Sequence, residues 1–264
     1  MFKTRLLSGI LLVAAALLTI ISGGYVLFFT LLCISLIGMQ ELNSAMKVRD
    51  GGFNSLEIAG YAGAILYYAA VLVDFEKYGT MAILASLVIL MFVYVFSYPK
   101  YNANQIMASF FGVAYVAVML SFIYLTRNLP QGKFLVWLIF LCSWGCDTCA
   151  YCVGVLIGKH KMAPVLSPKK SVEGAVGGVV GAALLGVAYA AATGGIMTEY
   201  AIICAVGALI SMIGDLAASA VKRNQGIKDY GKLIPGHGGI LDRFDSVIFT
   251  APVIYFLAKM VFGV

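Results

Sequence analysis

Apolar runs of about 17 residues or more recur from one end of this 264-residue chain to the other, and each is long enough to cross a lipid bilayer as a helix. Helices are favoured because lipid offers the backbone no hydrogen-bonding partner. Hydrophobic residues make up 62% of the chain and charged residues only 11%, whereas a soluble domain carries about 25% charged residues. The sequence therefore predicts an all-α fold, a polytopic transmembrane helical bundle, and excludes an ordinary soluble domain.

The apolar runs predict about nine spans, at residues 5–22, 24–40, 53–73, 80–98, 106–126, 134–158, 174–195, 198–220 and 246–263. Lys3 and Arg5 before the first run would also suit a secretory signal peptide. No clear small-x-small cleavage site follows, however, so we favour an uncleaved first span. We divide the chain into residues 1–130, with five transmembrane helices, and residues 131–264, with the remaining spans and two polar loops.

Basic residues predict the orientation, because cytosolic loops are enriched in Lys and Arg. Nine spans place the N-terminus on the same side as most of the basic loops, which are 41–52, 99–105, 159–173 and 221–245. This side is expected to be cytosolic, with the C-terminus outside. The net charge of +6 follows mainly from these loops, which would also attract anionic membrane lipids. Nucleic acid is not an expected partner, since no basic domain stands clear of the membrane.

Small residues inside two spans are interpreted as packing residues. One span holds four cysteines without the loop context of a zinc ribbon or a disulfide framework: Cys142, Cys146, Cys149 and Cys152. The next span has glycines at small-xxx-small spacing, which lets helices approach closely: Gly174, Gly177, Gly178 and Gly181.

Carboxylates occur where lipid should exclude them. Asp147 lies inside the sixth span, Asp215 lies inside the eighth, and Asp242 with Asp245 opens the ninth. A charge within a membrane helix is costly and by default marks a functional site or pathway. Several carboxylates near one predicted membrane face are harder to explain as helix packing than a single carboxylate would be.

The spacing around these carboxylates is helical, since Ser211, Asp215 and Ser219 lie four residues apart and share one helix face. Carboxylates, hydroxyls and water are the ligands that a hard cation such as Mg²⁺ prefers. Mn²⁺ would suit the same ligands, and a second cation could be bridged. Zinc is disfavoured because Cys and His at zinc-binding spacing are missing from the sequence.

Two basic loops, 158–174 and 219–245, flank the carboxylates. Gly236, Gly238 and Gly239 leave backbone amides open to an anion, and the lysines and arginines add positive charge. Neither loop has the Walker A spacing. Metal-binding carboxylates beside phosphate-binding cations indicate a phosphoryl or nucleotidyl transfer site.

The second loop resembles the signature of the phosphatidate cytidylyltransferases, also called CDP-diacylglycerol synthases: Ser219-x-x-Lys222-Arg223-x-x-x-x-Lys228-Asp229-x-x-x-x-x-Pro235-Gly-His-Gly-Gly239-x-x-Asp242-Arg243-x-Asp245. Further matches are Asp147-Thr148 with Tyr151, Gly154, Gly158-Lys159, Ser167-Pro168-Lys169-Lys170 and Gly214-Asp215. The resemblance covers residues 147–246, with Ser171 where a Thr often follows the lysine pair.

This resemblance implies a Mg²⁺-dependent reaction of CTP with phosphatidate that yields CDP-diacylglycerol and pyrophosphate. It also implies a bacterial plasma (inner) membrane location with the active site facing the cytosol, and it allows for a homodimer. Residues 131–264 would then be the catalytic region. Two alternatives stay open: a CTP-dependent lipid kinase, which would release CDP, and a membrane transporter of an anionic substrate.

The carboxylates are assigned roles as metal ligands on this basis. Asp215 and Asp242 are expected to bind metal and to be catalytic. Asp245 either binds metal or orients Arg243, itself a candidate substrate-binding residue. Asp147 binds metal, water or the cytidine ribose, or serves helix packing.

The remaining candidates would contact the substrates. Lys222 and Arg223, as catalytic residues, are expected to hold triphosphate or lipid phosphate, with the alternative that they only set the topology. The other candidate substrate-binding residues are Lys159, Ser167, Lys169, Lys170, Ser219, Lys228 and His237. Lys159, Lys169 and Lys170 could equally be topogenic. His237 would carry a proton, donate to a phosphate, or fix the glycine-rich turn.

Overall fold

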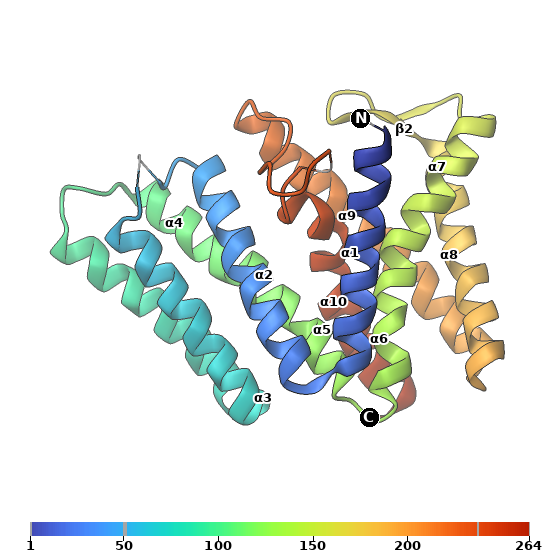
Figure 1. The fold of residues 1–264 in the computed structure, drawn as a ribbon, viewed down its shortest axis with the longest axis horizontal. Coiled ribbons are helices and arrows are strands. Elements are labelled where there is room, and N and C mark those ends of the chain that lie inside the picture. Colours follow the sequence, from blue (N-terminus) through green and yellow to red (C-terminus); the bar gives the residue numbers. More distant parts are fainter. Residues whose placement is uncertain (1, 50–51, 237, 264) are drawn as a thin grey trace. The chain divides into compact units, whose positions relative to one another are not determined.

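The structure is a computed structural model that describes residues 2–49, 52–236 and 238–263. Its helices are α1 (Phe2–Ser22), α2 (Gly24–Ala45), α3 (Ser55–Phe96), α4 (Ala103–Gly112), α5 (Met119–Arg127), α6 (Gly132–Phe140), α7 (Cys146–Ile157), α8 (Val172–Thr193), α9 (Met197–Asn224) and α10 (Leu241–Phe262) (Figure 1). Two π-helical segments, η1 (Val113–Val118) and η2 (Leu141–Gly145), and two short strands, β1 (Lys161–Ala163) and β2 (Ser167–Ser171), complete the described elements.

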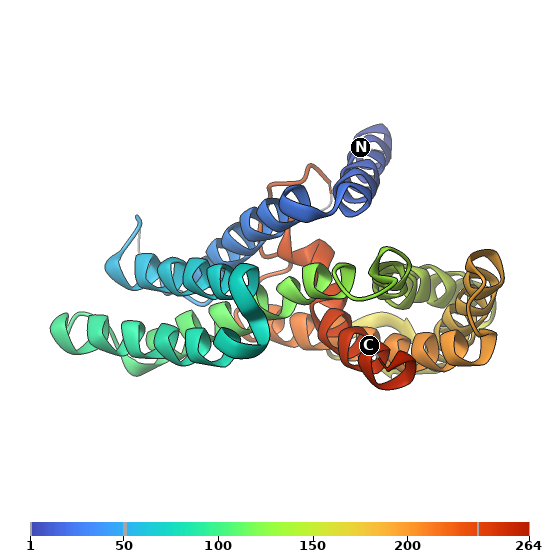
Figure 2. The ribbon, with the colours of Figure 1, turned by 90° about the horizontal axis from the view of Figure 1, so that it is seen from below.

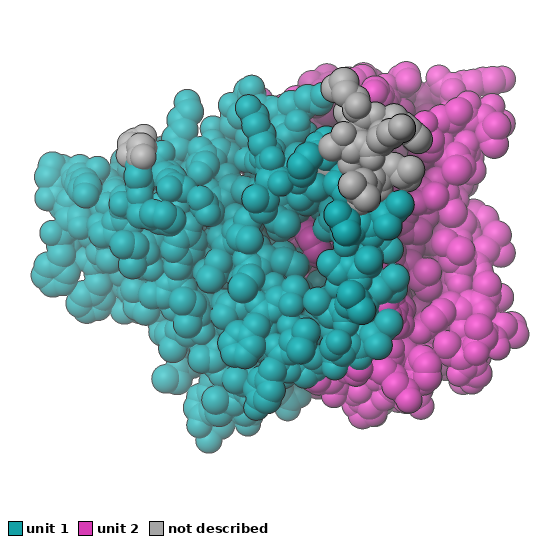
Figure 3. Space-filling view, in the orientation of Figure 1, with its two compact units in different colours: residues 1–124, 225–243 teal, residues 125–224, 244–264 magenta. Residues whose placement is uncertain are grey.

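The chain forms two compact units, coloured separately in Figure 3. The first comprises residues 1–124 and 225–243, and the second comprises residues 125–224 and 244–264. Residues 225–240, which join α9 to α10 and include Gly231, Gly236, Gly238 and Gly239, are called the glycine-rich loop below. This loop therefore packs with the N-terminal helices. The division into an N-terminal region and a catalytic region at residue 130 stays a prediction.

In the first unit, α3 folds back on itself. Its backbone leaves the helical conformation at Asp74, with φ −168° and ψ 100°, and the chain reverses direction there (Figure 2). The hydroxyl of Ser86 donates a hydrogen bond to the carbonyl of Gly63 at 3.2 Å. A straight helix would separate these residues by about 35 Å, at 1.5 Å per residue. The break lies in the loop predicted between the spans 53–73 and 80–98.

In the second unit, α7, α8 and α9 pack closely through glycines, and α7 and α8 lie side by side (Figure 1). A Cβ at Gly177 would meet Val153 at 2.5 Å, and one at Gly181 would meet Cys149 at 2.6 Å. The predicted role of these glycines in close helix packing is confirmed.

The cysteines of this unit are free thiols, as expected. Cys142 and Cys146 are buried, and Cys142 fills the space beside Gly207. Cys152 is exposed on the outer surface of α7. The packing interpretation therefore holds for the inner cysteines.

Among the described residues, seven helical segments are long and apolar enough to cross a membrane: α2, α3, α4 to α5, α6 to α7, α8, α9 and α10. Their outward residues are apolar and exposed, as lipid-facing residues should be; Phe96 is 81% exposed and Leu156 is 80% exposed. The predicted all-α, polytopic membrane fold is confirmed. The number of crossings stays a prediction, because α3 is a hairpin and α1 contributes only a shorter apolar helix, Ser8–Ser22.

Candidate active site

The second unit contains a cavity of about 590 Å³ that brings together residues from α7, the two strands, α8 and α9. Its charged lining consists of Asp147, Lys161, Lys169, Lys170 and Asp215. Four of these five were predicted as site residues from the sequence. The cavity also has an apolar side, since Tyr151 and Val155 line it and are 72% and 66% exposed.

The two carboxylates of the cavity lie at similar distances from the C-terminal ends of their helices. Asp147 lies in the first turn of α7, and Asp215 lies in the last third of α9. Each is roughly 14 Å from the C-terminal end of its helix, at 1.5 Å per residue. The π-helical turn η2 directly precedes α7 and widens the backbone there, a feature that is frequent at functional sites.

Lys170 of β2 forms an ion pair with Asp215 inside the cavity. Both side chains are 25% exposed, so the pair is partly shielded from water. The pairing offsets the cost of placing Asp215 within an apolar helix. The pair also leaves one cationic and one anionic side chain next to each other in the cavity.

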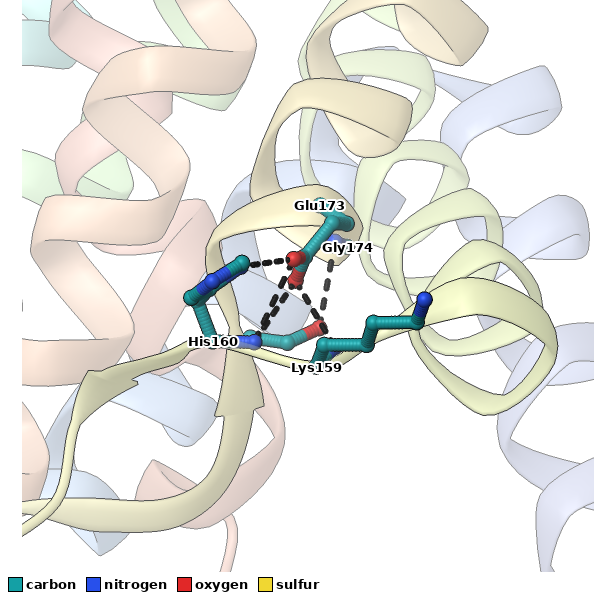
Figure 4. Close-up of polar contacts among 5 residues, drawn as sticks. Lys159, His160, Glu173 and Gly174 are labelled. Carbon is teal, nitrogen blue, oxygen red and sulfur yellow. Dashed lines mark hydrogen bonds and ion pairs between the residues drawn. The ribbon is translucent and has the colours of Figure 1, made fainter.

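A β-hairpin positions Lys170, with β1 and β2 antiparallel and Lys161 paired with Ser171. Its base is fixed to the start of α8 (Figure 4). The carboxylate of Glu173 accepts hydrogen bonds from the backbone N–H groups of Lys159, at 3.1 Å, and His160, at 3.2 Å. The His160 ring contacts the same carboxylate, with Nδ1 2.5 Å from Oε1. The hairpin is thereby anchored beside the cavity.

Two predicted residues of this loop do not line the cavity. The ammonium group of Lys159 points away from the Glu173 cluster (Figure 4), and Ser167 lies half-buried at the start of β2. Neither is among the lining residues. Lys161 does line the cavity but was not predicted as a site residue, because nothing in the sequence indicated the register of the hairpin.

A second ion pair lies where α9 meets α10. The ammonium nitrogen of Lys222 is 3.8 Å from Oδ2 of Asp245, and both side chains are largely buried. The helices touch beside Asp215, since a Cβ on Gly214 would be 3.0 Å from the backbone carbonyl oxygen of Asp245. Lys222 and Asp245 therefore belong to the same part of this unit as Asp215.

Asp242 belongs to the first unit, where the glycine-rich loop surrounds it. It is 4% exposed, and Oδ2 accepts hydrogen bonds from the backbone N–H groups of Tyr230, at 2.8 Å, and Gly239, at 3.0 Å. Gly238 has φ +87°, and a Cβ there would be 2.9 Å from the same oxygen. The loop thus holds the carboxylate of Asp242 in a fixed orientation.

The other predicted residues vary in exposure. Ser219 and Arg243 are half-buried, whereas Arg223 and Lys228 are exposed. His237 lies outside the described residues. The role of each as a substrate contact stays a prediction.

The donor atoms fit a cation that takes oxygen ligands. Within the described residues, no three His, Cys, Asp or Glu side chains gather closely enough to hold a metal by themselves. Mg²⁺ does not require such a cage, because it is usually bound by one or two carboxylates together with water and substrate phosphates. Asp147 and Asp215 in one cavity meet that requirement.

Comparison with known proteins gives one consistent result. Residues 3–261 match a model described as the cytidylyltransferase family. A phosphatidate cytidylyltransferase of Staphylococcus aureus (strain COL) is 32% identical over 266 residues, covering 97% of this chain and 98% of the relative. The phosphatidate cytidylyltransferase of Staphylococcus epidermidis (strain ATCC 12228 / FDA PCI 1200) is also 32% identical, over 263 residues with the same coverage.

Proposed function

Because this chain belongs to the cytidylyltransferase family, we propose that it transfers the cytidylyl group of CTP to phosphatidate, giving CDP-diacylglycerol and pyrophosphate. The observation that carries this proposal is the cavity, which combines a cationic lining with an apolar side. Phosphatidate has the same two parts, an anionic headgroup and apolar chains. CTP supplies the polyanion that the lysines would bind.

The reaction joins a phosphate oxygen of phosphatidate to the α-phosphorus of CTP. The bond from that phosphorus to the oxygen that bridges to the β-phosphate breaks, and pyrophosphate leaves. The lipid phosphate is largely ionised near neutral pH and needs no protein base. The main barrier is therefore the approach of two polyanions and the charge of the leaving group.

The residues of the cavity would lower that barrier. Lys161, Lys169 and Lys170 provide positive charge for the phosphates. A divalent cation such as Mg²⁺ would supply further charge to the leaving pyrophosphate, and Asp215 with Asp147 would hold it there. Asp242, in the first turn of α10, is also proposed as a metal ligand that serves the reaction.

We propose that the protein lies in the plasma membrane of a bacterial cell and that its cavity opens to the cytosol. The hairpin that supplies Lys161, Lys169 and Lys170 belongs to the basic loop 159–173, and basic loops are retained on the cytosolic side. The relatives come from bacteria. Water-soluble CTP would then reach the site from the cytosol and phosphatidate from the bilayer.

Product analysis with CTP labelled in its base tests the proposal. The purified protein in phosphatidate-containing vesicles should convert the label into a lipid-soluble product. Labelled CDP in the aqueous phase would instead indicate a CTP-dependent lipid kinase. Unchanged CTP inside the vesicles would indicate a transporter.

A further inference from the structure

Glu41 of α2 contacts the start of α10, 200 positions later in the chain. Its two carboxylate oxygens accept hydrogen bonds from the backbone N–H groups of Ile240, at 3.0 Å, and Leu241, at 2.9 Å. Both N–H groups belong to the helix N-terminus, where the helix offers no partner of its own. Glu41 therefore caps α10 from another helix.

The location of Glu41 within α2 would be unfavourable without this contact. The residue lies one turn before the C-terminal end of α2 at Ala45, where the helix dipole repels a negative charge. It is also buried, at 9% exposed. The positive N-terminal end of α10 offsets both costs, because it supplies N–H donors and a favourable dipole.

The glycine-rich loop is shaped around the same carboxylate. A Cβ on Gly231 would lie 2.3 Å from Oε1 of Glu41, and a Cβ on Gly239 would lie 2.4 Å from Oε2. Only glycine allows the loop backbone to approach this closely. Gly239 donates its own N–H to Asp242 on the other side, so the loop is held between two carboxylates.

We propose that Glu41 is a positioning residue for the reaction: it fixes the first turn of α10 and the glycine-rich loop, and thereby the orientation of Asp242. This inference rests on the proposed function, in which Asp242 serves the transfer. Glu41 does not touch the substrates in this proposal. It acts through the backbone of residues 239–241.

The test compares Glu41→Gln, Glu41→Ala and Gly239→Ala with a matched control, Glu57→Gln. Gln offers a single oxygen, so one of the two N–H groups loses its acceptor, and Ala removes both acceptors. Gly239→Ala pushes the carboxylate away from the loop without changing its charge. Glu57 is a suitable control because, like Glu41, it is a buried carboxylate of the first unit. Its contacts are Tyr61, whose hydroxyl donates at 2.9 Å, and Arg49.

Two readouts are combined: kcat for CDP-diacylglycerol formation, and hydrogen–deuterium exchange of peptides that cover residues 229–243. We expect the Glu41 and Gly239 variants to lower kcat at least about tenfold and to speed exchange in these peptides. Glu57→Gln should keep kcat within about twofold of the wild-type value and leave this exchange unchanged. This should hold even if Glu57→Gln lowers the melting temperature as much as the Glu41 and Gly239 variants do.

Wild-type exchange in the loop of all three variants would overturn the inference. So would faster exchange with an unchanged kcat, or an equal loss of kcat in Glu57→Gln. Failure of the proposed function gives a different result, because the wild-type protein itself would then form no labelled lipid. The exchange measurement would in that case still show whether Glu41 holds the loop.

Discussion

Asp215 lies within an apolar helix, and the ammonium group of Lys170 from β2 neutralises it. Single residues of this kind set the chemistry of the cavity, because a buried charge is retained only where a partner or a bound ion compensates it. Asp147 lines the same cavity from α7. Two carboxylates and three lysines in one cavity make its charge pattern suited to a metal-bound triphosphate.

Replacing the carboxylates that are proposed to bind metal should abolish most turnover. Asp215→Asn and Asp242→Asn should each lower kcat by at least about 100-fold, a loss of about 2.7 kcal/mol of transition-state stabilisation. The amide keeps the shape but removes the negative charge, and its oxygen can still accept the N–H groups that reach Asp242. Steady-state kinetics at saturating Mg²⁺ check this. Glu199→Gln, at the opposite end of α9, is the control and should leave kcat unchanged.

If either Asn variant folds normally and keeps more than about a third of the wild-type kcat, it has lost less than about 0.7 kcal/mol. The carboxylate in question would then be structural. Metal binding would then have to be assigned to other carboxylates.

Two lysines of the hairpin loop should behave differently. Lys170→Ala should lower kcat/KM about 10- to 100-fold, because it removes the cation paired with Asp215 inside the cavity. Lys159→Ala should change kcat/KM less than about threefold, since that side chain points away from the Glu173 cluster and does not line the cavity (Figure 4). Titrations of CTP and phosphatidate measure both. A change of less than about threefold in Lys170→Ala as well would indicate that Lys170 serves the topology alone.

At the scale of elements, the apolar spans and the glycine spacing of α8 could be predicted because both follow helical periodicity. The hairpin of β1 and β2 could not, since a loop of this length carries no usable period. Its strands place Lys161, Lys169 and Lys170 at the cavity, whereas Lys159 precedes the hairpin and does not line the cavity. The contact of Glu41 with α10 could not be predicted either, because a contact between residues 200 positions apart leaves no periodic pattern in the sequence.

The close packing of α7 against α8 gives a stability prediction. Gly181→Val should lower the free energy of unfolding by about 1–3 kcal/mol, since the added atoms would overlap Cys149. The neighbouring Val180 is 53% exposed, so Val180→Leu should have no measurable effect. Unfolding in mixed micelles measures both variants. An unaffected Gly181→Val would show that the two helices are not in close contact in solution.

At the scale of the whole molecule, a lipid-facing bundle carries a cavity with charged lining residues and an apolar side within its second unit. The general class of this fold could be predicted from hydropathy alone. Which carboxylates share a cavity required the structure, because Asp147 and Asp215 come from different helices. The structure also assigned the glycine-rich loop to the first unit, with α2, which no sequence pattern indicated.

Turnover should depend on a divalent cation. Protein purified free of metal should be inactive in excess chelator and should regain activity with Mg²⁺ or Mn²⁺, because both ions take oxygen ligands. The initial rate of labelled lipid formation is the measurement. Full turnover in the chelator would contradict the assignment of Asp215 and Asp242 as metal ligands.

The most direct measurement follows both ends of the CTP triphosphate, labelled separately at the α- and γ-phosphates, in wild-type protein and in Asp215→Asn. Wild-type protein should place the α-label in lipid and the γ-label in pyrophosphate in equal amounts. Asp215→Asn should lose both products together, by at least about 100-fold. A γ-label in lipid would contradict cytidylyl transfer, and a wild-type rate in Asp215→Asn would contradict the cavity as its site.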